Sequence, residues 1–233
     1  MSEAPPPAGF DQFAGNYDQA LQQGLSLSGE GKDFFAEGRV AWLRKRLEEL
    51  GTRPKAVLDF GCGTGTSVPL LLGLPGAESA VGVDLSEASL EVARRAYQRL
   101  PARFLPLGQF AAEAEFDLAF CNGVFHHIPL DQRDEAVRRV WRSLRPGGYW
   151  AFWENNPWNP GTRWVMKRIP FDRDAILVCP GEARRLLRAG GFEIIGSDFL
   201  FYFPRSLAWL RWLEPAFVKL PFGAQYLVLA RKP

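Results

Sequence analysis

Apolar and polar positions change their spacing several times along the chain, and these changes predict alternating helices and strands. Between residues 34 and 50 the apolar side chains fall on one helical face, and Gly51 follows where a helix would end. Strands are predicted over residues 55–60, 79–84, 103–107, 116–121 and 149–154. Helices are predicted between them, over residues 66–72, 86–100 and 131–144. Helical crossovers between successive strands imply a parallel sheet that is covered on both faces.

The regular alternation ends after residue 154. Residues 155–180 have no clean period and contain four prolines, which predicts an irregular insert. Beyond it, a short helix is predicted over residues 181–189 and strands over 192–203 and 225–232. Because no convincing crossover helix separates the two late strands, we expect an antiparallel pair at the sheet edge, with a helix over 205–219 inserted between them.

A glycine-rich turn is the most informative segment. Residues 57–65 read VLDFGCGTG, so a buried strand leads into Gly61, Gly63 and Gly65 and then into a helix. Without a Cβ atom, glycine adopts positive φ and lets a ligand lie against the backbone, and the following helix offers its first amides. The spacing G-x-G-x-G differs from the G-x-G-x-x-G of dinucleotide-binding turns, which favours a ligand without phosphates.

An acidic residue ends the next strand. Asp84 lies 19 residues after Gly65, and an acid at that strand end can accept two hydrogen bonds from a ribose diol. The alternative is that Asp84 only caps the following helix, a role for which Ser86 is better placed. The ribose role is the favoured interpretation.

Four segments occur in order: VLDFGCGTG, VGVDLS, FDLAFCNGVFHHIP and LRPGGYW. Their succession resembles the class I S-adenosylmethionine-dependent methyltransferases, and it is similar to the small-molecule branch that includes the quinone-biosynthesis enzymes. The resemblance covers residues 55–154 by motif, and 10–50 and 181–231 more loosely. It implies an α/β, Rossmann-like, doubly wound fold whose seven-stranded sheet is mostly parallel with an antiparallel last strand. An N-terminal helical lid and an insert after the fifth strand would complete the fold.

The resemblance implies S-adenosyl-L-methionine as the cofactor and S-adenosyl-L-homocysteine as its product. Asp59 and the glycine turn would meet the methionine part, Asp84 the ribose and Leu85 the adenine. This chain has Gly108-Gln109 where the family usually places an acid for the adenine amino group, so Gln109 or the backbone would serve there. The implied cofactor-binding residues are Tyr17, Asp59, Gly61, Cys62, Gly63, Gly65, Asp84, Leu85, Gln109, Cys121 and Asn122.

Methyl transfer requires an oriented acceptor and, for some acceptors, a base that removes a proton. His126 and His127 are the only histidines and follow Asn122 closely, so they are the candidate bases, with His127 favoured by the resemblance. We expect adjacent side chains on this segment to point apart, so that at most one faces the acceptor. The alternative is that one of them only packs the turn before Pro129. No metal-ligand cluster is evident in the sequence, and the reaction requires no metal.

The insert carries residues suited to an acceptor pocket. Trp158 and Trp164 would supply flat apolar walls, and Arg163 and Lys167 would bind an anionic group. They predict a small acceptor, aromatic or lipid-like and anionic, that is methylated on O, N or C. The alternative is an ordinary hydrophobic subdomain with a solvated basic face.

Composition and charge argue against nucleic acid and membrane insertion. The 28 basic and 26 acidic residues leave a charge of +2, which gives no electrostatic footprint for nucleic acid. No apolar run approaches the roughly 18 residues that span a bilayer. Three widely spaced cysteines and a proline-rich start without a signal-peptide pattern favour a reduced, cytoplasmic protein. Aromatic runs at 199–203 and 209–212 leave a homodimer open.

We therefore expect four parts. Residues 1–50 would form the lid and first helix, 51–154 the cofactor-binding core, 155–180 the acceptor-pocket insert and 181–233 the completion of the sheet. Two other functions are kept as alternatives. One is a non-catalytic partner subunit that binds S-adenosylmethionine, and the other is a nicotinamide-dependent oxidoreductase, which the glycine spacing disfavours.

Overall fold

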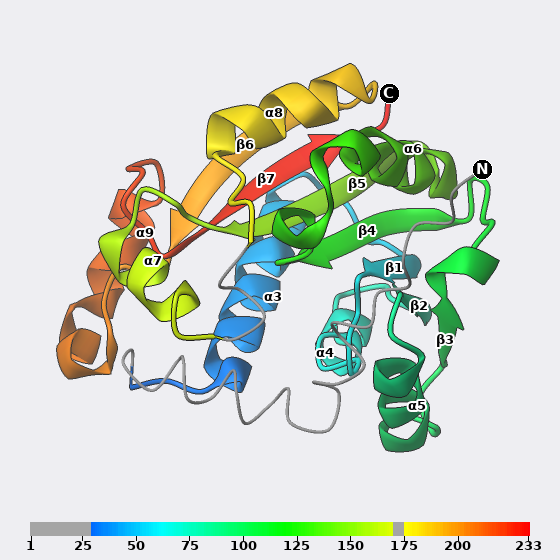
Figure 1. Cartoon of the computed structure of the whole chain (residues 1–233), viewed down its shortest axis with the longest axis horizontal. Coiled ribbons are helices and arrows are strands. Elements are labelled where there is room, and N and C mark those ends of the chain that lie inside the picture. The colour runs from blue at the N-terminus through cyan, green and yellow to red at the C-terminus, as the bar shows by residue number, and fades with distance from the viewer. Residues whose placement is uncertain (1–28, 170–174) are drawn as a thin grey trace.

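The computed structural model describes residues 29–169 and 175–233, and its centre is a seven-stranded sheet (Figure 1). The strands are β1 (Ala56–Phe60), β2 (Ser79–Asp84), β3 (Ala102–Pro106), β4 (Phe116–Asn122), β5 (Leu144–Asn155), β6 (Glu193–Leu200) and β7 (Gln225–Arg231). They lie in the order β3-β2-β1-β4-β5-β7-β6. The first five pair in parallel, whereas β7 runs antiparallel to both β5 and β6. The predicted mostly parallel sheet with an antiparallel last strand is confirmed.

Helices and 3₁₀ turns connect these strands. The α-helices in the described ranges are α3 (Lys32–Glu49), α4 (Val68–Leu72), α5 (Glu87–Ala96), α6 (Arg133–Ser143), α7 (Pro160–Met166), α8 (Pro180–Ala189) and α9 (Glu214–Phe217). The 3₁₀ turns are η2 (Leu107–Gln109), η3 (Phe125–His127), η4 (Leu130–Gln132) and η6 (Arg205–Leu213). None of these described helices is long and apolar enough to cross a membrane.

Both faces of the sheet are covered by helices (Figure 1). On one face, α3 and α4 bury Leu43 and Leu71 against strand residues such as Val57. On the other face, α6 and α8 bury Val140 and Leu187 in a second apolar cluster. Because both faces are buried, the strands are almost continuously apolar, as expected for a parallel sheet.

Several segments differ from the sequence-based expectation. Strand β5 already begins at Leu144, ahead of the strand predicted from residue 149. The strand predicted to reach residue 203 ends at Leu200, since Phe201 turns the chain with a φ of 62°. The single helix predicted over 205–219 is wrong: the chain forms η6 and then α9, with a non-helical Leu207 inside η6 and Pro215 at the start of α9. Within the irregular insert, Asn159 caps the short α7 by accepting a hydrogen bond from the Thr162 amide at 2.9 Å.

The strand order places a ligand site. From β1 the chain adds β2 and β3 on one side and then returns to add β4 and β5 on the other side, so the strand order reverses at β1. Open α/β sheets bind ligands beyond the carboxyl ends of the strands at such a switch point. Asp84, Asn122 and Asn155 each end a strand at this edge. The fold therefore gathers polar strand ends at one edge of an otherwise apolar layer.

The packing of α3 on the sheet can be tested at Leu43, whose side chain is fully buried. We expect Leu43→Ala to lower the free energy of unfolding by about 2–5 kcal/mol, because it removes buried methyl groups and leaves a cavity. Urea unfolding followed by circular dichroism measures the change. The matched control is Glu48→Ala on the exposed side of the same helix, which should stay within about 0.5 kcal/mol of the unsubstituted protein. Equal stability of the two variants would contradict the packing described.

Candidate active site

The glycine turn after β1 has the predicted left-handed backbone. Gly61, Gly63 and Gly65 have φ angles of 77°, 51° and 79°. A Cβ atom at Gly61 would collide with Val124, and one at Gly65 would press on Phe104 and neighbouring side chains at 3.0 Å. At Gly63, in contrast, a Cβ atom would meet nothing within 4 Å. The outer glycines are thus required by packing, whereas Gly63 offers bare backbone to open space.

Asp84 ties this turn to the next helix. Its Oδ2 accepts a hydrogen bond from the Gly63 amide at 2.8 Å, and its Oδ1 accepts one from the Ser86 amide at 2.9 Å. The helix cap is Ser86, whose hydroxyl oxygen accepts from the Ser89 amide. The carboxylate of Asp84 therefore belongs to the glycine turn.

Asp59 is a buried carboxylate on β1, with 2% of its surface exposed. Burial and, to a smaller extent, the negative charge of Asp84 raise its pKa to about 7, although the positive charge of Arg39 opposes both effects. Its Oδ2 has no hydrogen-bond partner in the described part of the chain. An unsatisfied buried acceptor is costly, so this oxygen marks a place where a ligand can donate a hydrogen bond.

The other predicted cofactor residues lie in varied surroundings. Cys62 and Cys121 are buried, and burial raises the pKa of both thiols well above the ordinary value, so they stay protonated. Leu85 is 63% exposed just beyond β2, and Gln109 is exposed at the end of η2. Tyr17 lies outside the described residues. The structure thus brings together Asp59, the glycine turn and Asp84, and it leaves Leu85 and Gln109 at the surface.

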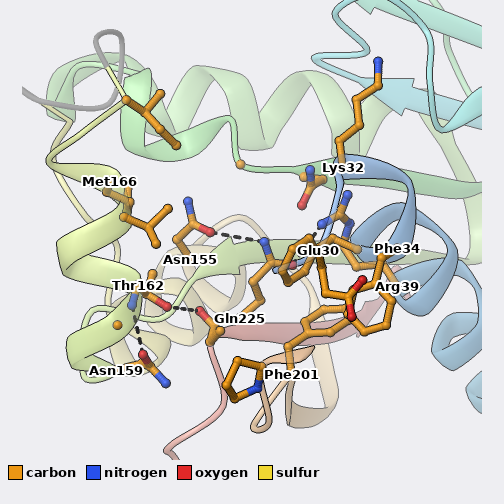
Figure 2. A pocket seen from close by; sticks show the side chains of 18 of the residues that line it. Glu30, Lys32, Phe34, Arg39, Asn155, Asn159, Thr162, Met166, Phe201 and Gln225 are labelled. Carbon is orange, nitrogen blue, oxygen red and sulfur yellow. Dashed lines mark hydrogen bonds between the residues drawn. The ribbon is translucent and has the colours of Figure 1, made fainter. Parts of the chain in front are cut away.

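A cavity of about 450 Å³ opens beside this site, at the carboxyl ends of β4 and β5 (Figure 2). Its walls come from the start of α3, from η3, from α7 and from the chain before η6. Aromatic side chains dominate part of the wall: Phe34, Phe35, Trp164, Phe201, Tyr202 and Phe203. Polar groups line the strand ends: Arg39, Asn122, His126, His127, Asn155 and Gln225. The cavity has the size and the mixed lining of a small-molecule site.

A histidine–carboxylate pair forms part of the cavity wall. His126 Nδ1 lies 2.6 Å from Glu154 Oε2, and Glu154 Oε1 accepts a hydrogen bond from the Phe125 amide at 2.8 Å. Both side chains of the pair are almost fully buried. The rings of His126 and His127 lie only 4.0 Å apart and both line the cavity, so the expectation that they point apart is wrong. The tight turn of η3 keeps the two rings on the same side.

The predicted acceptor residues separate into two groups. Trp164 lines the cavity, with the guanidinium of Arg168 lying 3.6 Å from its ring centre. Trp158, Arg163 and Lys167 are exposed and are not among the lining residues, and Trp158 stacks on Phe199 instead.

Sequence reasoning missed several lining or supporting residues, namely Arg39, Glu154, Asn155 and Gln225. Glu154 and Asn155 end an apolar strand, as Asp84 does, so the rule applied to Asp84 could also have found them. No local signal marks Arg39, which lies within a helix, or Gln225, which begins the last strand. Arg39 and Gln225 become part of the cavity wall only because segments that are distant in sequence meet in the fold.

The strand order and the polar residues at the strand ends are typical of an enzyme that binds a nucleoside cofactor. A protein-family model described as a methyltransferase domain matches residues 57–148. This match, together with the relatives described below, supports a class I S-adenosylmethionine-dependent methyltransferase with S-adenosylmethionine as the cofactor. The same comparisons favour methyl transfer over nicotinamide-dependent oxidation.

The chain is similar in sequence to two methyltransferases of named activity. The chain is 28% identical over 182 residues to a ubiquinone biosynthesis O-methyltransferase of Bordetella pertussis, covering 71% of this chain and 73% of the relative. It is 28% identical over 183 residues to the enzyme of the same name from Pseudomonas putida, covering 71% and 75%.

Solved structures share the fold. A chain of a complex that contains the Haloferax volcanii Trm112 methyltransferase activator has a TM-score of 0.65, with 17% identity and coverage of 97% and 98%. A possible histamine N-methyltransferase of Thermotoga maritima has a TM-score of 0.63, with 20% identity and coverage of 96% and 98%. At these identities the likeness concerns the fold alone.

The residues present fit the cofactor. S-adenosylmethionine carries an amino group and a ribose diol, both hydrogen-bond donors. Asp59 offers a buried acceptor oxygen without a partner among the described residues, and Gly63 offers backbone that no side chain covers. A ligand that carries hydrogen-bond donors and lies across the glycine turn would account for both features.

The raised pKa of Asp59 predicts a pH-dependent stability. A carboxyl group with a pKa of about 7 in the folded protein and about 4 in the unfolded chain binds more protons when folded between these values. The free energy of unfolding should therefore fall as the pH rises from 4 to 7. Asp59→Asn should remove that contribution, which is on the order of 4 kcal/mol.

Urea unfolding of both proteins between pH 4.5 and 8 measures this difference. Asp33→Asn, which changes an exposed carboxylate of α3, is the control for the loss of one carboxylate. If the stability difference between Asp59→Asn and the unsubstituted protein does not change with pH, the environment assigned to Asp59 is wrong.

Proposed function

We propose that this methyltransferase transfers a methyl group to the hydroxyl oxygen of a small aromatic acceptor held in the cavity, with His126 as the base. The observation that carries the proposal is the buried His126–Glu154 pair in the wall of an aromatic-lined cavity. The relatives named ubiquinone biosynthesis O-methyltransferase support oxygen over nitrogen or carbon as the methylated atom.

Three groups would hold the cofactor. Asp59 would accept hydrogen bonds from its amino group, Asp84 would face the ribose, and the backbone at Gly63 would lie against it. When bound there, S-adenosylmethionine supplies an electrophilic methyl group on a positively charged sulfur. Asn122 ends β4 and lines the cavity, so it lies on the side of the cofactor site that faces the acceptor.

The flat aromatic walls of the cavity would orient the acceptor and would exclude water from it. Phe34, Phe201 and Trp164 provide flat apolar surfaces from three separate elements of the chain. An aromatic ring between such surfaces keeps few orientations and displaces water from the base. The aromatic or lipid-like acceptor class inferred from the insert is therefore kept, although most of its walls come from other elements.

Glu154 would fix the protonation state of His126. As a carboxylate it accepts a hydrogen bond from His126 Nδ1, which makes Nδ1 the protonated nitrogen and Nε2 the one that can take a proton. A hydroxyl group that gives its proton to Nε2 becomes a better nucleophile. The imidazolium that results would be stabilised by the same carboxylate. His127, favoured in the sequence, packs on the His126 ring and would help to hold it in place.

The non-catalytic partner subunit remains a competing function. One structural neighbour is a chain from a complex with a methyltransferase activator. That assembly is a property of the neighbour. In this chain, the buried histidine–carboxylate pair beside an open cavity favours catalysis over a purely supporting role.

The cofactor site can be tested with two matched glycine variants. We expect Gly63→Val to weaken S-adenosylmethionine binding at least 100-fold, since the new side chain would occupy the space where the ligand lies. Gly51→Val is the control: Gly51 also has a positive φ and open space around it, but it lies at the end of α3. Both variants carry the same kind of backbone strain. Isothermal titration calorimetry that finds equal affinities in the two variants would rule out a ligand at Gly63.

The base can be tested with three variants. Using radiolabelled S-adenosylmethionine and a panel of mono- and dihydroxylated aromatic acceptors, we expect His126→Gln and Glu154→Gln to lower kcat by about 10²-fold or more. The affinity for S-adenosylhomocysteine should stay unchanged in both. His127→Gln is the comparison and should lose less than tenfold. An unchanged kcat in His126→Gln, or transfer to amine acceptors only, would overturn the proposed function.

A further inference from the structure

Three side chains at the sheet edge form a chain of hydrogen bonds with a fixed direction. Arg39 Nη1 donates to Gln225 Oε1 at 2.9 Å, and Gln225 Nε2 donates to Asn155 Oδ1 at 3.2 Å (Figure 2). Asn155 and Gln225 are also register partners across β5 and β7, so the strand pairing holds their backbones opposite one another. The three residues come from α3, β5 and β7, and all of them line the cavity.

Arg39 sets the direction of both hydrogen bonds in this series. A guanidinium group only donates hydrogen bonds, so Gln225 must turn its oxygen toward Arg39. The amide nitrogen of Gln225 then faces Asn155, which must present its own oxygen in return. As a result, the Asn155 amide nitrogen points away from Gln225 (Figure 2), and no hydrogen bond is recorded for it within residues 29–169 and 175–233.

Burial makes the arrangement rigid. Arg39 is only 6% exposed, and its positive charge acts on the buried Asp59, where it opposes the rise in the pKa of that carboxyl. Removal of Arg39 from this position would leave Asp59 without its compensating charge. Burial and the charge of Asp59 therefore hold the Arg39 guanidinium, which sets the direction of the hydrogen bonds, in its position.

We propose that the Asn155 amide nitrogen is a hydrogen-bond donor subsite that recognises a carbonyl-type oxygen on the acceptor molecule. The inference rests on the proposed function, because it assigns this cavity to the acceptor. Among apolar walls such as Phe34 and Phe201, a donor without a partner favours a ligand oxygen and disfavours an amine or a bare alkyl group. The acceptor class thus becomes a hydroxylated aromatic compound that also bears a ketone, an ester, a quinone or a carboxylate oxygen.

Binding of paired probes tests the subsite without requiring methyl transfer. With the full chain saturated with S-adenosylhomocysteine, calorimetry compares 4-hydroxyacetophenone with 4-ethylphenol, which replaces the carbonyl by a methylene, and with 4-hydroxybenzoate. We expect at least tenfold tighter binding of an oxygen-bearing probe than of 4-ethylphenol. The carboxylate probe distinguishes an anionic from a neutral oxygen. Equal affinities for all three, or no binding of any, would overturn the proposal.

Two substitutions should abolish this preference in different ways. Asn155→Leu removes the donor. Gln225→Glu introduces a carboxylate that cannot donate, so Asn155 must turn its nitrogen toward that carboxylate and show its oxygen to the cavity. Both variants should bring the affinity ratio to about one. Gln132→Leu is the control, since it removes an exposed side-chain amide that is not among the residues lining the cavity, and it should leave the affinity ratio unchanged. A ratio that Asn155→Leu leaves unchanged would overturn the subsite.

Side-chain amide exchange measured by NMR provides a test without any acceptor. In the unsubstituted protein we expect the Gln225 amide hydrogens to exchange slowly and those of Asn155 to exchange rapidly. In Gln225→Glu, the Asn155 amide hydrogens should become protected. Protection of Asn155 in the unsubstituted protein would overturn the inferred direction of the chain. This result is independent of whether His126 acts as a base, so the two proposals can fail separately.

Discussion

Charged side chains buried at the carboxyl edge of the sheet constrain the rest of the site. Asp59, Arg39 and Glu154 each lie below 9% exposure between two apolar layers, where an uncompensated charge is expensive. Glu154 is satisfied by the Phe125 amide and by His126, and Arg39 donates to Gln225. Asp59 keeps a buried carboxylate oxygen without a recorded partner in the described chain, and this carboxylate lies on the strand that leads into the glycine turn.

Helix α3 joins the two halves of the site. Its Leu43 and Leu47 anchor it on the sheet, and Arg39 on the same buried face reaches the strand ends. From there the arginine acts electrostatically on Asp59, on the proposed cofactor side, and by hydrogen bond on Gln225, on the proposed acceptor side. One residue would thus contribute to the electrostatics of the proposed cofactor site and to the hydrogen-bond polarity of the cavity.

The fold was predictable because its signals are local and repeated. Apolar runs alternating with amphipathic helices define the parallel sheet. The glycine turn and the strand-end acid were assigned to one ligand site, and Gly63 and Asp84 share a 2.8 Å hydrogen bond in the structure. Short or kinked elements were less predictable: α7 has only seven residues, and η6 is interrupted at Leu207. The period of such segments is too short to stand out from irregular sequence.

The acceptor cavity was harder to predict because its contacts are distant in sequence. Arg39 and Gln225 are 186 residues apart, and they meet only because β7 inserts antiparallel beside β5. The composition of the insert drew attention to Trp158, Arg163, Trp164 and Lys167, yet only Trp164 lines the cavity. Composition shows that a segment carries aromatic and basic groups, but the face that they occupy depends on the capping and direction of α7.

The end of β5 suggests how one acceptor would meet both polar groups. Successive residues of a strand point to opposite faces, so Glu154 is directed toward His126 while Asn155 is directed toward α3 and Arg39. Under the proposed function, the base and the donor would then approach a ring from the two sides of one strand end. A compound with a hydroxyl group on one side and a carbonyl oxygen on the other would satisfy both, whereas a compound with a single polar group would leave one of them unsatisfied. The alternation of a β-strand would in this way become a rule of substrate selection.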